Sequence, residues 1–158
     1  MSIVVARVDD RLVHGQVVIG WGRPLEVDRI VLVDAEVATS DFERDLYRMA
    51  VPEGIEIEFI GPEAAPARLE ALEESGERLL ILTGTVAGMT RLARDYHGIK
   101  AVNLGGIHDG PGRHEYLRYV YLTDAELADL KSLAREGVVV TAQDLPTSAP
   151  VHLEQLSR

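Results

Sequence analysis

The stretch that decides how this chain is organised is Ala6-Arg7-Val8-Asp9-Asp10-Arg11-Leu12-Val13-His14-Gly15-Gln16-Val17. The chain enters it through the apolar, β-branched run Ile3-Val4-Val5-Ala6, which predicts a short buried strand over residues 2–6. Apolar residues then recur at helical spacing, at Val13, Val17 and Trp21, and predict a helix over residues 14–22. His14 therefore stands where a strand passes into a helix.

The residue types around His14 suit phosphoryl chemistry. A helix N-terminus offers unpaired N–H groups and a positive dipole end to an anion. Arg7 and Arg11 carry permanent charges and can bind phosphate oxygens in bidentate fashion. A neutral imidazole is a nucleophile, and its unperturbed pKa is about 6.5. We therefore expect His14 to accept a phosphoryl group, with both arginines and loop amides stabilising the transferred charge.

Simpler interpretations of the same residues exist. A lone histidine after a strand is usually structural or simply exposed, and Asp9 and Asp10 beside arginines are typical of a solvated ion-pair cluster. Asp10 lies four residues before His14, so its carboxylate could orient the imidazole and select its tautomer. The same pair could serve a small-molecule hydrolase or isomerase with His14 as general base. That alternative predicts a deep substrate pocket, whereas a carrier needs an exposed histidine.

The segment R-V-D-D-R-L-V-H-G-Q-V resembles the phosphorylation-site loop of IIB components of the mannose/fructose/sorbose class of the bacterial phosphotransferase system. Four further stretches resemble the family: Val31–Asp34, Met49–Pro52, Val102–Gly106 and Arg135–Val138. The resemblance implies that His14 receives a phosphoryl group from a IIA protein. The group then passes to a sugar carried by membrane IIC and IID components, and in the family it sits on Nδ1.

The resemblance also implies the reaction class and its setting. The chain would be a protein-Nπ-phosphohistidine–sugar phosphotransferase that needs no metal or organic cofactor. It would work in the cytoplasm at the periphery of the membrane transporter, whose other components hold most of the selectivity for sugar. A relay that passes phosphate to a regulator, without transport, is the alternative within the family.

Strands and helices alternate along the chain. Further strands are predicted over residues 27–33, 55–60, 79–82, 101–104, 116–122 and 138–142, and helices from Ser40 or Asp41 to Ala50 and over residues 62–74, 86–96 and 124–136. The apolar stripe of the helix before Pro52 is Phe42, Leu46, Met49 and Ala50. This pattern predicts an α/β fold: an open, mostly parallel sheet with helices on both faces. The phosphorylation loop then lies at the carboxyl end of the first strand, where such sheets bind ligands.

Four loops are expected to meet at that edge, namely residues 7–15, 34–39, 83–85 and 103–108. Their candidate phosphate-binding or supporting residues are Asp9, Gly15, Gln16, Thr83, Thr85, Asn103 and Gly105. His108 follows two glycines and could come near the site. Leu12 and Val13 are candidates for apolar contact with docking proteins.

Composition limits the function classes. The 158 residues predict one domain, 1–158, and the absence of cysteine excludes disulfides and thiolate metal sites. The histidines do not have zinc-site spacing, so no metal is expected. A net charge of −10 argues against nucleic-acid binding, while a locally basic loop suits a small anion or a phosphorylated partner. No signal peptide or membrane span is expected, and a homodimer is a further candidate assembly.

Overall fold

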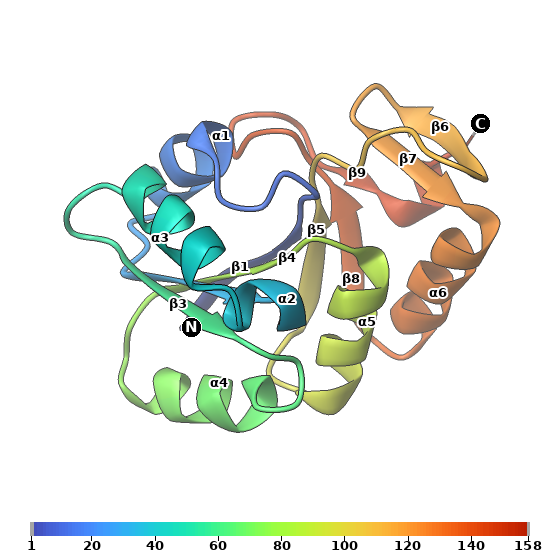
Figure 1. Ribbon diagram of the computed structural model, residues 1–158. Coiled ribbons are helices and arrows are strands. Elements are labelled where there is room, and N and C mark those ends of the chain that lie inside the picture. The colour runs from blue at the N-terminus through green and yellow to red at the C-terminus, as the bar shows by residue number, and fades with distance from the viewer. Residues whose placement is uncertain (1, 158) are drawn as a thin grey trace.

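The structure, a computed structural model, describes residues 2–157 as a seven-stranded sheet between two layers of helices (Figure 1). The strand order is β3-β2-β4-β1-β5-β8-β9, and every neighbouring pair is parallel except β8 and β9. The strands are β1 Ile3–Val8, β2 Arg29–Val33, β3 Glu56–Ile60, β4 Leu79–Thr83, β5 Ala101–Leu104, β8 Val139–Ala142 and β9 Val151–His152. The predicted fold class is confirmed.

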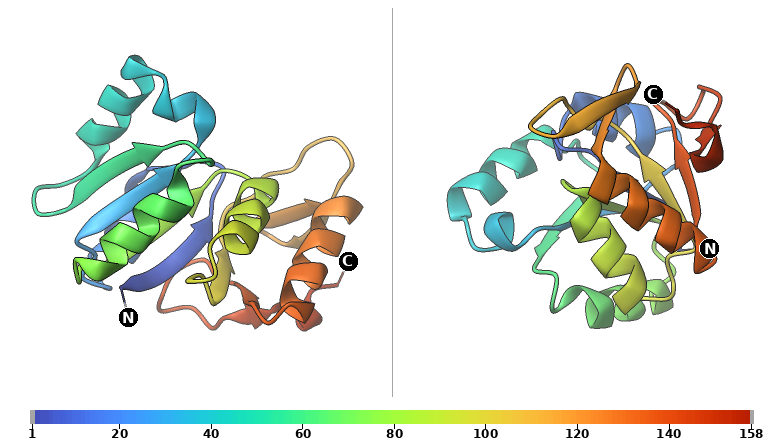
Figure 2. Two further views of the ribbon diagram at one scale, coloured as in Figure 1. Left: turned by 90° about the horizontal axis from the view of Figure 1, so that it is seen from below. Right: turned by 90° about the vertical axis from the view of Figure 1, so that its right-hand side faces the viewer.

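The helices divide between the two faces of the sheet (Figures 1 and 2). One face carries α1 Gly15–Val17, its π-helical continuation η1 Val18–Gly22, α2 Ala35–Ala38 and α3 Asp41–Ala50. The other carries α4 Ala65–Glu74, α5 Val86–Asp95 and α6 Asp124–Arg135. None of these helices, within residues 2–157, is long and apolar enough to cross a membrane.

The strand order creates a topological switch point beside β1. From the end of β1 the chain turns through α1 towards β2, whereas from the end of the neighbouring β4 it turns through α5 towards β5. The two loops lead to helices on opposite faces of the sheet, and open α/β sheets bind ligands at such points. All residues of β4 are buried and β3 is an edge strand, as their apolar and alternating sequences predict.

The strand predicted over residues 116–122 is wrong. This segment folds as an antiparallel hairpin, β6 Arg113–Leu117 and β7 Val120–Thr123, outside the main sheet. Arg118 and Tyr119, which link the two strands, include none of the Gly, Asn or Asp residues that announce a tight turn. Near the C-terminus the sequence does not distinguish a short strand from a helical turn. The structure has both, because β9 is followed by the 3₁₀ turn Leu153–Gln155.

The apolar stripe of α3 faces solvent instead of the core. Phe42, Leu46 and Met49 are 76%, 53% and 84% exposed, and no residue of α3 is buried. The helix lies against the sheet through other residues: the Tyr47 ring centroid is 6.4 Å from that of Phe59. Periodicity correctly indicates an amphipathic helix, but it does not say whether the apolar face is covered.

Candidate functional site

Asp9 is the centre of the polar network at the end of β1. Its carboxylate is fully buried, and Oδ2 lies 3.1 Å from Arg11 Nη2, 3.3 Å from His14 Nε2 and 3.7 Å from Arg7 Nη2. Oδ1 accepts hydrogen bonds from Arg11 N and Nε. Burial alone would raise the pKa of Asp9, but the contacts with His14 and Arg11 hold it well below its usual range. Asp9 is therefore a permanent anion under the histidine.

The two ring nitrogens of His14 face different groups. Nδ1 accepts a hydrogen bond of 3.2 Å from Gln16 N, so the imidazole caps the start of α1. Nε2 faces the Asp9 carboxylate, which favours a proton on that nitrogen. The lone pair is then on Nδ1, and the side chain is 21% exposed. This geometry leaves the lone pair on Nδ1, directed at the amide of Gln16 at the start of α1.

Arg7 does not reach the surface where a phosphoryl group would arrive. It is fully buried, with its guanidinium 4.5 Å from the Trp21 ring centroid. Its Nη1 donates to Asn103 Oδ1 and to Gln143 O, and its Nη2 donates to Asp144 O. Burial lowers the pKa of Arg7 to about 10, although Asp9 opposes the shift. The expected role in binding the transferred group is therefore corrected: Arg7 holds Asp9 and the loop after β8 in place.

Arg11 is the arginine that remains available to a ligand. Its side chain is 36% exposed while its guanidinium contacts Asp9 through Nε and Nη2. One buried carboxylate thus fixes the direction of a cation that still has donors facing solvent.

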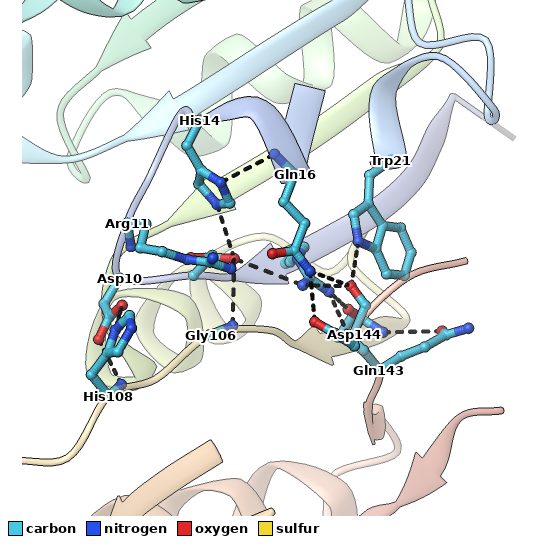
Figure 3. A network of polar contacts seen from close by, with 12 residues as sticks. Asp10, Arg11, His14, Gln16, Trp21, Gly106, His108, Gln143 and Asp144 are labelled. Atoms are coloured by element: carbon cyan, nitrogen blue, oxygen red, sulfur yellow. Dashed lines mark hydrogen bonds and ion pairs between the residues drawn. The ribbon is translucent and has the colours of Figure 1, made fainter. Parts of the chain in front are cut away.

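The expected pairing of Asp10 with His14 is wrong. Asp10 Oδ1 lies 2.6 Å from His108 Nδ1, and Asp10 Oδ2 accepts 2.8 Å from His108 N. The i,i+4 spacing brings side chains together only on a helix, and helix α1 begins after this segment. Leu12 has a left-handed φ of 59°, which reverses the loop and turns Asp9, not Asp10, towards His14. His108 does come to the loop, on the far side of Asp10 (Figure 3).

Several other candidate residues have structural partners. Thr83 Oγ1 donates to Thr85 O, and Thr85 Oγ1 accepts from Gly88 N and caps α5. Asn103 is 7% exposed and bonded to Arg7. A Cβ at Gly105 would lie 2.4 Å from Arg7 Cζ, so the glycine makes room for that guanidinium. Each of these four residues therefore has a role within the fold, and its contact with a phosphate stays a prediction.

The loop after β8 belongs to the site, which the sequence did not reveal. Asp144 Oδ1 accepts 2.6 Å from Gln16 Nε2, and Asp144 O accepts from Trp21 Nε1 and Arg7. This loop therefore locks the helix that begins after His14 to the buried arginine. Asp144 lies far along the chain from His14, and no local motif marks it. Trp21, expected in the core, is buried there at 3% exposure.

The remaining expectations concern surface contacts and metals. Val13 is 4% exposed and packs in the core, so it cannot form part of a docking surface, whereas Leu12 is partly exposed. Gly15 has open space where a Cβ would stand. Within residues 2–157 no group of three or more His, Asp or Glu side chains could hold a metal ion.

Comparisons with known proteins point to one family. Residues 3–158 match the family described as PTS system sorbose subfamily IIB component. The N-acetylgalactosamine-specific phosphotransferase enzyme IIB component 1 of Escherichia coli K12 is 30% identical over 146 residues, which cover 92% of each chain. The crystal structure of the IIBSor domain of the sorbose permease from Klebsiella pneumoniae is 26% identical, with a TM-score of 0.89 over 98% of this chain and 96% of that one. The mannose-specific EIIAB component of E. coli K12 is 26% identical over 99% of this chain, which spans 48% of that protein.

Proposed function

Because the chain belongs to the sorbose-subfamily IIB components of the phosphotransferase system, a family of sugar phosphotransferases, we propose that it carries its phosphoryl group on Nδ1 of His14. The observation that supports this most is the pair of contacts on the imidazole. Asp9 faces Nε2 and Gln16 N–H faces Nδ1, so the nucleophilic nitrogen and an anion-binding amide point to the same place. The chain contains no cysteine, so a thiolate cannot take the phosphoryl group.

The donor in this proposal is the phosphohistidine of a IIA protein. The mannose-specific relative is named EIIAB, and this chain matches only about half of it. A IIA unit is therefore joined to a IIB unit in that relative, which supports a IIA protein as the phosphoryl donor of this chain. The hydrogen bond from Gln16 N–H to Nδ1 breaks as the donor arrives, and the freed Nδ1 lone pair attacks phosphorus in line. An Nδ1–P bond forms, and the donor P–N bond breaks with its electron pair returning to the donor imidazole. Arg11 and the amide of Gln16 stabilise the phosphoryl oxygens, while Asp9 stabilises the proton on Nε2.

The acceptor in this proposal is a sugar presented by IIC and IID components in the membrane. The sugar oxygen forms a bond to phosphorus as the Nδ1–P bond breaks, the electron pair returns to Nδ1, and the hydroxyl proton leaves to solvent. The protein would act at the cytoplasmic side of that assembly. Relay to a regulator would use the same His14 chemistry, and a general-base hydrolase built on Asp10 loses its basis because Asp10 pairs with His108.

Phosphate incorporation tests the proposal. Wild type, His14→Ala and His108→Ala would be incubated with enzyme I, the histidine carrier protein, a mannose-class IIA domain and labelled phosphoenolpyruvate. We expect acid-labile, alkali-stable label on wild type and His108→Ala and none on His14→Ala. Phosphorus NMR should then assign the label to Nδ1. Label on His14→Ala, or no label on wild type while IIA is charged, would refute the assignment.

A further inference from the structure

Asp144, in the loop after β8, bonds to both of the helical turns that follow His14. Its carboxylate oxygen Oδ1 accepts a hydrogen bond of 2.6 Å from Gln16 Nε2, near the start of α1. Its backbone oxygen accepts one of 3.0 Å from Trp21 Nε1, in η1, and one of 3.2 Å from Nη2 of the buried Arg7. Figure 3 shows Gln16 and Trp21 converging on Asp144 from the same helical segment.

The π-helical winding of η1 allows Gln16 and Trp21 to reach Asp144 together. In an α-helix each residue turns by about 100°, so two residues five positions apart would lie about 140° apart around the axis. A π-helix bonds residue i to residue i+5, as Arg23 N bonds Val18 O at 3.2 Å, and such turns are rare and frequent at functional sites. The wider turn reduces that angle, and the segment after His14 is wound so that it meets Asp144.

The loop that carries Asp144 is itself held in place. Gln143 Nε2 donates to two carbonyl oxygens of the same loop, and Gln143 O accepts 2.8 Å from Nη1 of the buried Arg7. Leu145 packs on Gly20 of η1 so closely that a Cβ on this glycine would lie 2.7 Å from Leu145 Cδ2. Asp144 is therefore a fixed anchor for the Gln16 side chain.

Gln16 is the residue through which this anchor reaches the histidine. Gln16 N donates 3.2 Å to His14 Nδ1, the nitrogen that carries the phosphoryl group in the proposed function. In that transfer the same amide leaves Nδ1 and stabilises a phosphoryl oxygen. A donor that is already in position does this without reorganisation, whereas a displacement of about 1 Å can cost about 100-fold in rate.

We propose that Asp144 is a positioning residue for phosphoryl transfer, which holds the Gln16 side chain and thereby fixes the Gln16 amide at His14 Nδ1. The inference rests on the proposed function and assigns Asp144 a role through Gln16, without contact to the phosphoryl group. The bond from the amide to the carboxylate is short and charge-assisted, so it restricts Gln16 more than a bond between neutral groups would.

The test compares the rates at which charged IIA labels wild type, Asp144→Ala, Gln16→Ala and the double variant. We expect Asp144→Ala to lower the maximal rate about 10–100-fold at an unchanged half-saturating concentration of IIA, because the anchor acts after docking. The double variant should be no slower than Gln16→Ala, because both substitutions break one contact. Asp144→Asn keeps an oxygen that accepts from Gln16 Nε2 and should restore most of the rate.

Two further measurements separate positioning from general destabilisation. Thr123→Ala removes the N-cap of α6, outside the polar network around His14, and should make the protein easier to unfold in urea without slowing its labelling. The amide proton of Gln16, followed by NMR in the unphosphorylated proteins, should move upfield in Asp144→Ala as its bond to His14 Nδ1 weakens. It should stay in place in Thr123→Ala.

Four results would overturn the inference and leave the carrier function intact. They are equal labelling rates in wild type and Asp144→Ala, a double variant slower than Gln16→Ala, an Asp144→Asn variant as slow as Asp144→Ala, and a loss of rate in Thr123→Ala as large as that in Asp144→Ala. No label on wild type while IIA is charged would refute the carrier function and, with it, the role of Asp144.

Discussion

Replacing Asp9 by asparagine tests the central relation in the site, because one carboxylate holds two arginines and the histidine. The substitution keeps the size of the side chain and removes its charge. Arg7 then stays buried, bonded to Asn103 and backbone carbonyls, but without its counter-ion. The new amide can also donate to Nε2 of His14, which would move the ring proton to Nδ1 and block the nucleophile.

Both effects have a magnitude that follows from burial. Removing one partner of a buried ion pair costs about 3–5 kcal/mol, and we expect about 3 kcal/mol because the amide oxygen still accepts hydrogen bonds. For a chain of this length that corresponds to a fall of about 6–12 °C in Tm. Loss of the correct tautomer should slow phosphorylation by about 10²–10⁴-fold.

Asp10→Asn is the matched control for Asp9→Asn. Asp10 is a neighbouring aspartate whose side chain is 25% exposed, and its partner His108 is 66% exposed. An exposed pair contributes about 0–1 kcal/mol, so Asp10→Asn should change neither unfolding nor phosphorylation appreciably. Urea unfolding and the initial rate of label incorporation from charged IIA measure the two quantities. The reasoning is refuted if Asp9→Asn behaves as wild type, or if Asp10→Asn is the variant that loses phosphorylation.

Three further predictions concern charge, packing and exposure. The difference in free energy of unfolding between wild type and Asp9→Asn should shrink as the pH falls below about 3.8, the ordinary pKa of an aspartate. The pKa of Asp9 is lowered in the folded state, so its charge stabilises the fold above pH 3.8, and this stabilisation is lost progressively as acid protonates the carboxylate. Urea unfolding at pH 7 and at pH 3 measures the difference. Gly105→Ala should lower the free energy of unfolding by about 1–3 kcal/mol, because the new Cβ would overlap the buried Arg7 guanidinium. Gly15→Ala, with open space around the Cβ, should change it by no more than about 0.5 kcal/mol. Equal destabilisation by the two substitutions would contradict this packing. Leu46→Ser on the exposed face of α3 should change the free energy of unfolding by less than about 0.5 kcal/mol, against about 2–5 kcal/mol for Leu80→Ala in the core, and a large cost at Leu46 would show that α3 is covered in solution.

The order of strands and helices could be predicted because each central strand carries its own signal. Residues 79–82 are uniformly apolar and became the buried β4, and residues 55–60 alternate and became the edge strand β3. The helix from Thr123 has a capping box, and the box is present in the structure. These signals are local, so a single sequence contains them. The hairpin at Arg118 and Tyr119 lacked a local signal and was missed.

The sequence predicted the position of the candidate site but not the contacts between its side chains. The apolar run before His14 predicts a strand and the helical spacing of apolar residues after it predicts a helix, so the position of His14 at their junction could be predicted. Which aspartate faces the ring depends on the left-handed φ of Leu12, a conformation that leucine rarely adopts and that no spacing rule anticipates. The burial of Arg7 depends on β8 and its loop, far along the chain, and tertiary contacts of that kind leave no motif near His14.

The buried arginine explains how an acidic protein can present a positive site. Asp9 is held ionised, and its charge must be balanced in the interior; Arg7 does this from below, where no solvent reaches. With Asp9 neutralised from that side, the exposed charge of Arg11 is not cancelled by the carboxylate that orients it. In the proposed transfer, an incoming phosphoryl group would meet the solvent-exposed side of Arg11 and the amide of Gln16, in a chain whose net charge of −10 would otherwise repel it. In the proposed transfer, Arg7 would therefore act through charge balance, because it lies out of reach of the phosphoryl group.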